Sequence, residues 1–206
     1  LAYGFKRFSE DLDFNVARVD NREFERVSEF IIAELKRENI YSEVTFEHRG
    51  RLSSAEFIFK NVLEYYRIKD KRGTLMVKFE TNRPLFKLET ESVTVSSFGE
   101  IFPIKIMSKG SIFAEKIDAL RHIKKGRHVY DIIIMLSKKF PINEYVLEAN
   151  GIKEEPKEVI LNIINEFNPS ELRRLAIGLR PFLFNEEEFN LVVNAKTVIK
   201  DLLDKY

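Results

Sequence analysis

Residues 7–14 read RFSEDLDF, and the last four of them alternate between acidic and apolar side chains. A period of two is typical of a β-strand, because successive side chains point to opposite faces. Asp11 and Asp13 are then expected on one face of a strand, with Leu12 and Phe14 on the other. Two aspartates so placed have Cα atoms ~6.6 Å apart, and their negative charges repel each other. We therefore expect some feature of the site to offset this repulsion.

The composition narrows the class of protein. With 206 residues, 44% of them hydrophobic and 12% aromatic, the chain can build one ordinary domain or two small ones around a real core. Charged residues make up 33%, yet the net charge is only +1, which argues against an electrostatic clamp for long nucleic acids and leaves room for a local basic pocket. The absence of cysteine excludes disulfides and thiolate metal sites and favours a cytoplasmic location. No apolar stretch predicts a membrane helix, and no signal peptide is visible.

The N-terminal half is predicted to contain strands and one helix. Asp20 and Glu23 have the spacing of an acidic capping box. The helix that follows is expected to bury one face, made of Phe24, Val27, Ile31 and Leu35. Three extended runs come next, at residues 41–49, 55–62 and 74–82, with a turn over residues 69–73, and a short edge strand is expected over residues 91–97.

The C-terminal half is predicted to be helical. Strand patterns stop at Ser108, and Gly or Pro residues divide the rest into pieces of helical length. The last piece, residues 186–206, carries apolar side chains at helical spacing, namely Val192, Ala195, Ile199 and Leu202. These patterns predict an α+β protein, with an α/β core at residues 1–107 and a helical domain at residues 108–206.

Two charged residues of the helical half stand among apolar neighbours. Lys116 rises from a largely apolar helix face, where a lysine can simply cover the edge of the core with its stem. Asp131 stands at the head of the apolar run IIIML, where it could cap a helix or pair with Arg127 one turn earlier. Neither residue alone indicates a functional site.

An acidic segment near the N-terminus and a basic segment in the helical half together form a recognisable pattern. Arg7, Ser9, Asp11 and Asp13 are followed about a hundred residues later by AEKIDALRHIKKGRHVYDI, which starts at residue 114. In this order they resemble the AbiEii/AbiGii toxin family of nucleotidyltransferases, which also includes the MenT toxins. The family pattern is Gly-Gly-Thr/Ser, Arg-x-Ser-x-Asp-x-Asp, a further acidic strand, Lys-x-x-Ala-Leu and Arg-Asp-x-Tyr-Asp. The matching positions of the later elements are Lys116, Ala119, Leu120, Arg127, Tyr130 and Asp131.

The resemblance implies a nucleotidyltransferase-like mixed sheet with flanking helices, and it implies metal chemistry. Transfer of a nucleotidyl group needs neutralisation of the charge that grows on the phosphates, which Mg²⁺ or Mn²⁺ held by carboxylates can supply. Asp11 and Asp13 are the expected metal ligands, and the bound cation would offset their repulsion. Glu80, on a neighbouring strand, is the expected third ligand, with Glu89 and Glu91 as competitors.

The resemblance also assigns roles to basic and polar residues. Lys116 becomes a phosphate contact, and Arg7 and Arg127 become candidates for phosphate or carboxylate pairing. Ser9 either bonds a phosphate or braces the turn into the strand. Asp131 is expected to orient Lys116, Arg127 or the acceptor. The expected catalytic set is therefore Asp11, Asp13, Lys116 and Asp131, and the expected nucleotide-binding set is Arg7, Ser9, Lys116 and Arg127.

The chain departs from the family pattern at two places. The Gly-Gly-Thr turn belongs just upstream of Leu1, Gly4 does not replace it, and we expect that further residues precede Leu1. His128 stands where the family has an acidic residue.

The expected function is therefore that of a toxin-like, metal-dependent nucleotidyltransferase. It would transfer a nucleoside monophosphate from a nucleoside triphosphate to an acceptor, with the 3′ end of tRNA as one candidate, and it would be paired with a separately encoded antitoxin. One alternative is a related module that has lost catalysis and binds RNA or a protein partner. The other is a structural helical adaptor in which residues 7–14 are a surface strand and Lys116 covers core.

Overall fold

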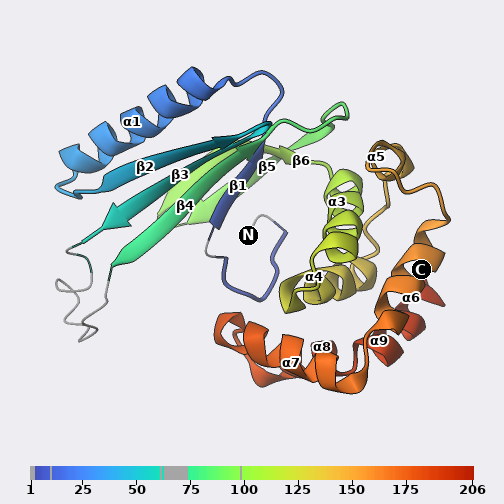
Figure 1. Ribbon diagram of the computed structural model, residues 1–206. Coiled ribbons are helices and arrows are strands. Elements are labelled where there is room, and N and C mark those ends of the chain that lie inside the picture. Colours follow the sequence, from blue (N-terminus) through green and yellow to red (C-terminus); the bar gives the residue numbers. More distant parts are fainter. Residues whose placement is uncertain (1–2, 10, 61, 63–73, 98) are drawn as a thin grey trace. The chain divides into compact units, whose positions relative to one another are not determined.

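The computed structural model describes residues 3–9, 11–60, 62, 74–97 and 99–206 (Figure 1). The chain forms two compact units. The sheet unit is Ser9–Leu88, and the helical unit combines Glu89–Tyr206 with the residues that precede Ser9. The boundary therefore divides the motif at residues 7–14, since Arg7 and Phe8 belong to the helical unit and both aspartates to the sheet unit. The turn predicted over residues 69–73 lies outside the described residues.

The sheet unit consists of one mixed sheet and one helix. The sheet has the strand order β1-β4-β3-β2, in which β1 runs parallel to β4 and the other neighbours are antiparallel. Figure 1 shows the helix lying along one face of this sheet. The elements are β1 (Asp11–Asn15), α1 (Asn21–Arg37), β2 (Glu43–Arg49), β3 (Leu52–Phe59) and β4 (Leu75–Asn82). The predicted α+β class, with a mixed sheet and flanking helices, is confirmed.

The predicted capping box starts helix α1. The carboxylate of Asp20 accepts from the Glu23 amide at 2.8 Å, and the carboxylate of Glu23 accepts from the Asp20 amide at 3.2 Å. Phe24 is buried and stacks on Phe79 of β4, with ring centroids 5.1 Å apart. Val27 was expected on this buried face, but it is 48% exposed, and Ser28 takes the inner position four residues after Phe24. A serine is tolerated there because its hydroxyl donates to the Phe24 carbonyl at 3.0 Å.

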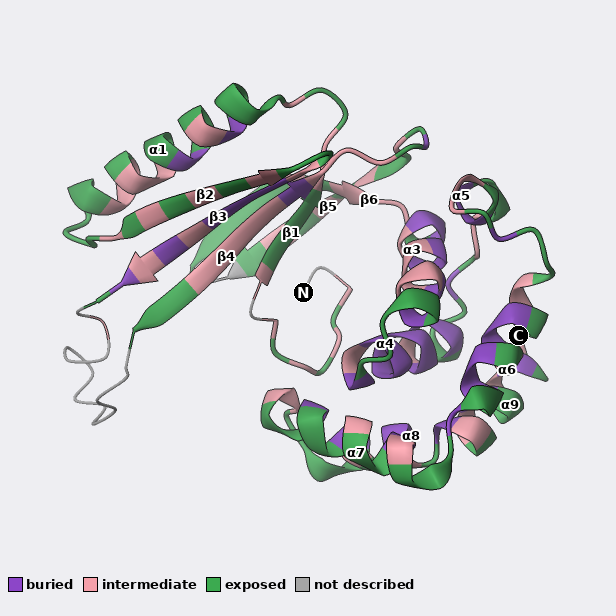
Figure 2. Cartoon of the chain, in the orientation of Figure 1, coloured by how far each residue is buried: buried purple, intermediate pink, exposed green. Residues whose placement is uncertain are grey.

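The core of the sheet unit lies between α1 and the apolar face of the sheet. Its buried members are Phe24, Ala55, Phe57 and Phe59, and the partly buried Val77 and Phe79 pack against them. Every second residue of β3, from Ser53 to Phe59, is buried, and Figure 2 shows buried positions along this strand. The opposite face of the sheet therefore carries the polar side chains of the alternating pattern.

The helical unit begins with a hairpin that sequence analysis had placed with the N-terminal half. Strand β5 (Thr90–Ser97) was expected as an edge strand, and it pairs with β6 (Glu100–Met107) in a two-stranded sheet. Strand β6 was not predicted. The hairpin groups with the helices because its ends are tied to them: Ser108 donates its amide to the Glu89 carbonyl at 2.8 Å, and Asn143 donates its side-chain amide to the Glu89 carboxylate at 2.9 Å.

The remaining elements are helices, as predicted. The most buried of them is α4, nine of whose residues are buried (Figure 2). Gly126 starts α4 against α7, where a Cβ atom would lie 2.3 Å from the Leu175 carbonyl oxygen. The elements are α3 (Lys109–His122), α4 (Gly126–Ser137), α5 (Glu144–Ala149), α6 (Pro156–Glu166), α7 (Pro169–Leu179), the 3₁₀ turn η1 (Arg180–Phe182), α8 (Glu186–Val193) and α9 (Ala195–Leu203).

The C-terminal piece differs from its prediction in two details. It is broken at Asn194 into α8 and α9. Val192, Ala195 and Ile199 are buried as expected, but the fourth buried position is Leu203 rather than Leu202. Among the described residues, the helices are all too short or too polar to traverse a bilayer.

Candidate functional site

The two aspartates of β1 lie on the polar face of the sheet. Phe14 packs edge-to-face on Phe79, with ring centroids 5.3 Å apart, so it belongs to the apolar face. Asp11 and Asp13 are at odd positions of the same strand and therefore project from the other face, as the alternation predicted. Asp11 is half-buried and Asp13 is exposed. Leu12 and Phe14 remain 44% and 50% exposed because β1 is an edge strand.

Strand β4 brings further charges next to these aspartates. In the parallel register, Asp11 lies opposite Lys78 and Asp13 lies opposite Glu80. The next strand places Glu56 opposite Lys78. Partners in register share a face of the sheet, so these five charged side chains form one group, which we call the acidic face. It contains four carboxylates and one ammonium.

Lys78 is a positive charge that offsets part of the repulsion on the acidic face. Its Nζ lies 2.6 Å from Oε1 of Glu80, and the two side chains are 33% and 20% exposed. The hydrogen bond with Glu80, followed by the negative charges of Glu80, Asp11 and Glu56, raises the pKa of Lys78 above its ordinary value. Sequence analysis missed this lysine, although its place between Val77 and Phe79 put it on the same face as Glu80.

The acidic face suits a divalent cation only in part. Within the ranges that the structure describes, no three acidic or histidine side chains are grouped as a metal site on their own. Mg²⁺, however, is commonly held by one or two carboxylates together with substrate phosphates and water. Asp11 and Asp13, two residues apart on one face, match that donor set. The assignment of Glu80 as the third ligand remains a prediction, since Glu80 is paired with Lys78 in this structure.

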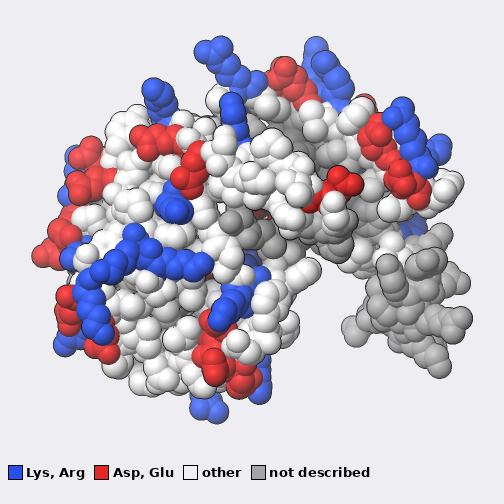
Figure 3. Space-filling model, turned by 180° about the vertical axis from the view of Figure 1, so that it is seen from behind, with Lys and Arg blue, Asp and Glu red and all other residues white. Residues whose placement is uncertain are grey.

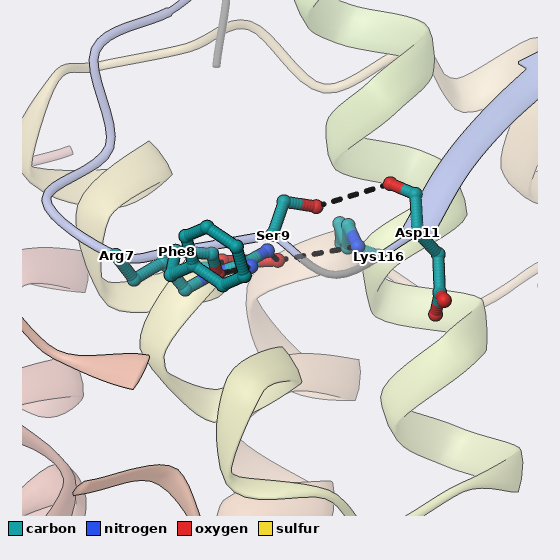
Figure 4. A network of polar contacts seen from close by, with 6 residues as sticks. Arg7, Phe8, Ser9, Asp11 and Lys116 are labelled. Atoms are coloured by element: carbon teal, nitrogen blue, oxygen red, sulfur yellow. Dashed lines mark hydrogen bonds and ion pairs between the residues drawn. The ribbon is translucent and has the colours of Figure 1, made fainter. Parts of the chain in front are cut away.

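Ser9, Glu89 and Glu91 each form a hydrogen bond with another group of the protein. Ser9 donates its hydroxyl to the backbone carbonyl of Asp11 at 3.3 Å, which braces the entry into β1 (Figure 4). Glu89 and Glu91, the competitors of Glu80, belong to the helical unit. Glu89 accepts from Asn143, and Glu91 accepts from the Tyr3 hydroxyl at 2.5 Å.

The helical unit holds a buried carboxylate with two cationic partners. Asp131 is fully buried in α4, and its two oxygens accept from Nε and Nη2 of Arg7 at 2.7 Å and 2.8 Å. Nζ of Lys116, on α3, lies 3.2 Å from Oδ2 of the same carboxylate. Figure 4 shows Arg7 and Lys116 with these ion pairs drawn as dashed lines. Asp131 therefore does not cap the helix, whose N-cap is Lys125. Its carboxylate instead pairs with two cationic side chains.

Backbone pairing fixes Arg7 beside this carboxylate. Arg7 forms an isolated antiparallel bridge with Leu183, and the Phe8 amide donates to the Phe182 carbonyl at 2.7 Å. Burial works against the charged form of Arg7, but its hydrogen bonds and attraction to Asp131 raise its pKa, so the guanidinium stays charged. Fully buried ion pairs are stable only when hydrogen bonds satisfy the charged atoms, and this bidentate pair meets that condition.

His128 and Arg127 lie in the first turn of α4, next to this ion-pair network. The His128 side chain is buried, and its Nδ1 has no hydrogen-bond partner in the described part of the chain. Burial, followed by the positive charges of Lys116 and Arg127, lowers the pKa of His128 to about 4. His128 is therefore neutral at physiological pH, and it supplies no negative charge where the family pattern has an acid. Arg127 is half-buried in the same turn.

No sign of charge dominates among the described residues on the face of the molecule seen in Figure 3. On the face seen in Figure 3, basic and acidic side chains lie interspersed. This agrees with the net charge of +1. A general positive field, which would attract any polyanion, is therefore not seen on the described part of this face.

Comparison with known proteins gives one match. The family model described as "Nucleotidyl transferase AbiEii toxin, Type IV TA system" matches residues 1–188. The match covers both units, including Asp11, Asp13, Lys116 and Asp131. Searches of curated proteins and of solved structures gave no significant match.

Proposed function

Because the chain belongs to the AbiEii nucleotidyl transferase toxin family, we propose that it transfers a nucleoside monophosphate to an acceptor in a Mg²⁺-dependent reaction. Membership makes it a nucleotidyltransferase of the toxin type, with a nucleoside triphosphate as substrate. The type IV toxin–antitoxin class implies a separately encoded antitoxin. The metal, the acceptor and the residue roles are the parts proposed here.

Asp11 and Asp13 are the proposed metal ligands. The observation that carries this proposal is their position on one face of β1, with Asp13 opposite Glu80 in the register of β1 and β4. When bound, a divalent metal neutralises charge on the phosphates as the acceptor oxygen attacks the α-phosphorus and pyrophosphate leaves. Mn²⁺ has the same preference for carboxylate oxygens and would serve as an alternative ion.

Lys116 is the proposed phosphate contact, and Asp131 positions it. A buried carboxylate that binds Lys116 at 3.2 Å holds its ammonium in one place, which spares the entropy of ordering a long side chain during binding. Arg7 neutralises Asp131 with two hydrogen bonds from its guanidinium, so the three side chains together keep the positive charge of Lys116. We therefore assign Arg7 to bracing Asp131, and Arg127 to phosphate binding.

The 3′ end of tRNA is the proposed acceptor. This part of the proposal rests on the family resemblance, together with exposed basic residues that follow Lys116 along the chain, at Arg121 and Lys125. Basic side chains attract a polyanion through its phosphates, and salt would weaken this attraction. A transfer assay with total RNA, tRNA alone and protein extract as acceptors distinguishes RNA from other acceptors.

Nucleotide binding with and without Mg²⁺ tests the site directly. We expect wild-type protein to bind nucleoside triphosphate in the presence of Mg²⁺, and Asp11→Asn and Asp13→Asn to lose that Mg²⁺-dependent binding while their circular dichroism spectra stay unchanged. Glu34→Gln is the matched control, because Glu34 is an acid of the same unit that lies on α1 and pairs with Arg37 at 2.5 Å. Full binding by both aspartate variants would refute the assignment.

A further inference from the structure

The acidic face contains its own cation. Nζ of Lys78 lies 2.6 Å from the Glu80 carboxylate, and the register sets Lys78 opposite Asp11 on one side and opposite Glu56 on the other. The Lys78 side chain is only 33% exposed. It therefore stands among three carboxylates in partial shelter from water, where attraction between opposite charges is stronger than at an open surface.

We propose that Lys78 is a positioning residue that competes with the divalent metal for the acidic face and so sets the metal affinity of the enzyme. This inference rests on the proposed function, in which Asp11 and Asp13 hold the metal. In this structure the lysine neutralises part of the charge and holds Glu80 in an ion pair. A metal ion that binds to Asp11 and Asp13 has to overcome the repulsion of this ammonium.

The ion pair with Lys78 also affects how Glu80 can bind a cation. Lys78 and Glu80 are alternate residues of β4, so they project from the same face, and their ion pair runs along the strand. While this pair is formed, one oxygen of Glu80 is engaged by the ammonium and is less available to a cation. Lys78 therefore controls whether Glu80 joins Asp11 and Asp13 as a third ligand.

The size of the effect follows from the charges. A unit charge and a doubly charged ion at ~6 Å, about the spacing of alternate residues on a strand, repel enough in a water-like dielectric to change a dissociation constant roughly tenfold. A lower local dielectric would increase this factor. Replacing Lys78 by an uncharged side chain of similar length should therefore tighten metal binding by roughly tenfold or more.

Mn²⁺ alone is the probe for this test, because the electron paramagnetic resonance signal of free Mn²⁺ is lost as the ion binds. We expect Lys78→Met to bind Mn²⁺ roughly tenfold more tightly than wild type, and Lys78→Arg, which keeps the positive charge, to resemble wild type. Lys60→Met is the matched control. Lys60 is another lysine of the sheet unit, and it pairs with Glu43 at 2.5 Å. It lies six residues after Ser54, the residue of β3 opposite Glu80, and so stands away from the acidic face.

The outcomes separate this inference from the proposed function. If wild type binds Mn²⁺ through Asp11 and Asp13 but Lys78→Met binds it equally or more weakly, the competition by Lys78 is refuted and the metal site stands. If wild type and Lys78→Met both fail to bind Mn²⁺ on its own, the competition by Lys78 is refuted. The Mg²⁺-dependent nucleotide binding described above then decides whether Asp11 and Asp13 hold a metal together with phosphates. Circular dichroism of each variant verifies that the change in affinity belongs to a folded protein.

Discussion

Acidification should destabilise this protein through one buried histidine. His128 lies in the first turn of α4 with a buried imidazole, and the charged groups around it are Lys116 from α3 together with Lys125, Arg127 and Asp131 from its own helix. Burial disfavours the charged imidazolium, and the three cations repel it. Asp131 is the one neighbour that attracts it, but both oxygens of that carboxylate are already paired.

The sign and size of this effect follow from linkage. The pKa of His128 is about 4 in the folded protein, against ~6.5 in an unfolded chain. Between these values the unfolded state binds the proton and the folded state does not, so the free energy of unfolding falls as the pH falls from 6.5 toward 4. For one group with this shift, lowering the pH from 7 to 5 costs about 2 kcal/mol of stability.

Urea denaturation of wild type and His128→Gln at pH 7 and pH 5 measures this cost. The amide of glutamine stays neutral over the whole range, so the variant should lose about 2 kcal/mol less than wild type on acidification. His122→Gln is the control, because His122 is exposed at the end of α3, where it pairs with Asp118 at 3.3 Å. Circular dichroism at 222 nm follows the helices that contain both residues. Equal losses in wild type and His128→Gln would refute the reasoning.

Two further predictions concern packing and charge in the helical unit. Asp131→Asn should lower the free energy of unfolding by about 3 kcal/mol, because it leaves Arg7 and Lys116 without their counter-charge; urea denaturation checks this, and a change below ~1 kcal/mol would contradict the importance of the ion pairs. Gly126→Ala should destabilise by about 2 kcal/mol or more, because its methyl group would lie 2.3 Å from the Leu175 carbonyl. Gly178→Ala, whose added methyl group would meet no atom from outside its own helix backbone within 4 Å in the described part of the chain, should instead raise stability by up to ~1 kcal/mol. Thermal unfolding of both glycine variants compares them, and equal shifts would argue against the close approach of α4 and α7.

Local patterns predicted most of the secondary structure correctly. The alternation of Asp11–Phe14, the capping box of Asp20 and the apolar run of α4 each describe interactions within a few residues, and each element is present. Strand β6 was missed because Pro103 interrupts its alternation. Proline is tolerated there because, among the strands that the structure describes, β6 pairs with β5 alone, and its outer edge needs no backbone donor.

The relations between distant residues could not be read from the sequence. Arg7 and Asp131 are separated by 124 positions, and nothing local to either residue predicts their ion pair. Lys78 is a similar case: its strand was predicted, but the parallel register that sets it opposite Asp11 depends on how β1 joins the sheet. From the alternation we expected the repulsion between the aspartates to be offset by a bound cation, which stays a prediction. The structure adds Lys78 of the protein itself, which lies opposite Asp11.

The central claim is that Asp11 and Asp13 carry metal-dependent nucleotidyl transfer. Its most direct test incubates the protein with each of four α-labelled nucleoside triphosphates, total RNA and Mg²⁺, and follows label in the RNA after electrophoresis. The account predicts label that requires Mg²⁺ and at least one of the four nucleotides, and that disappears in Asp11→Asn and Asp13→Asn but not in Glu34→Gln. Undiminished labelling by both aspartate variants would contradict it.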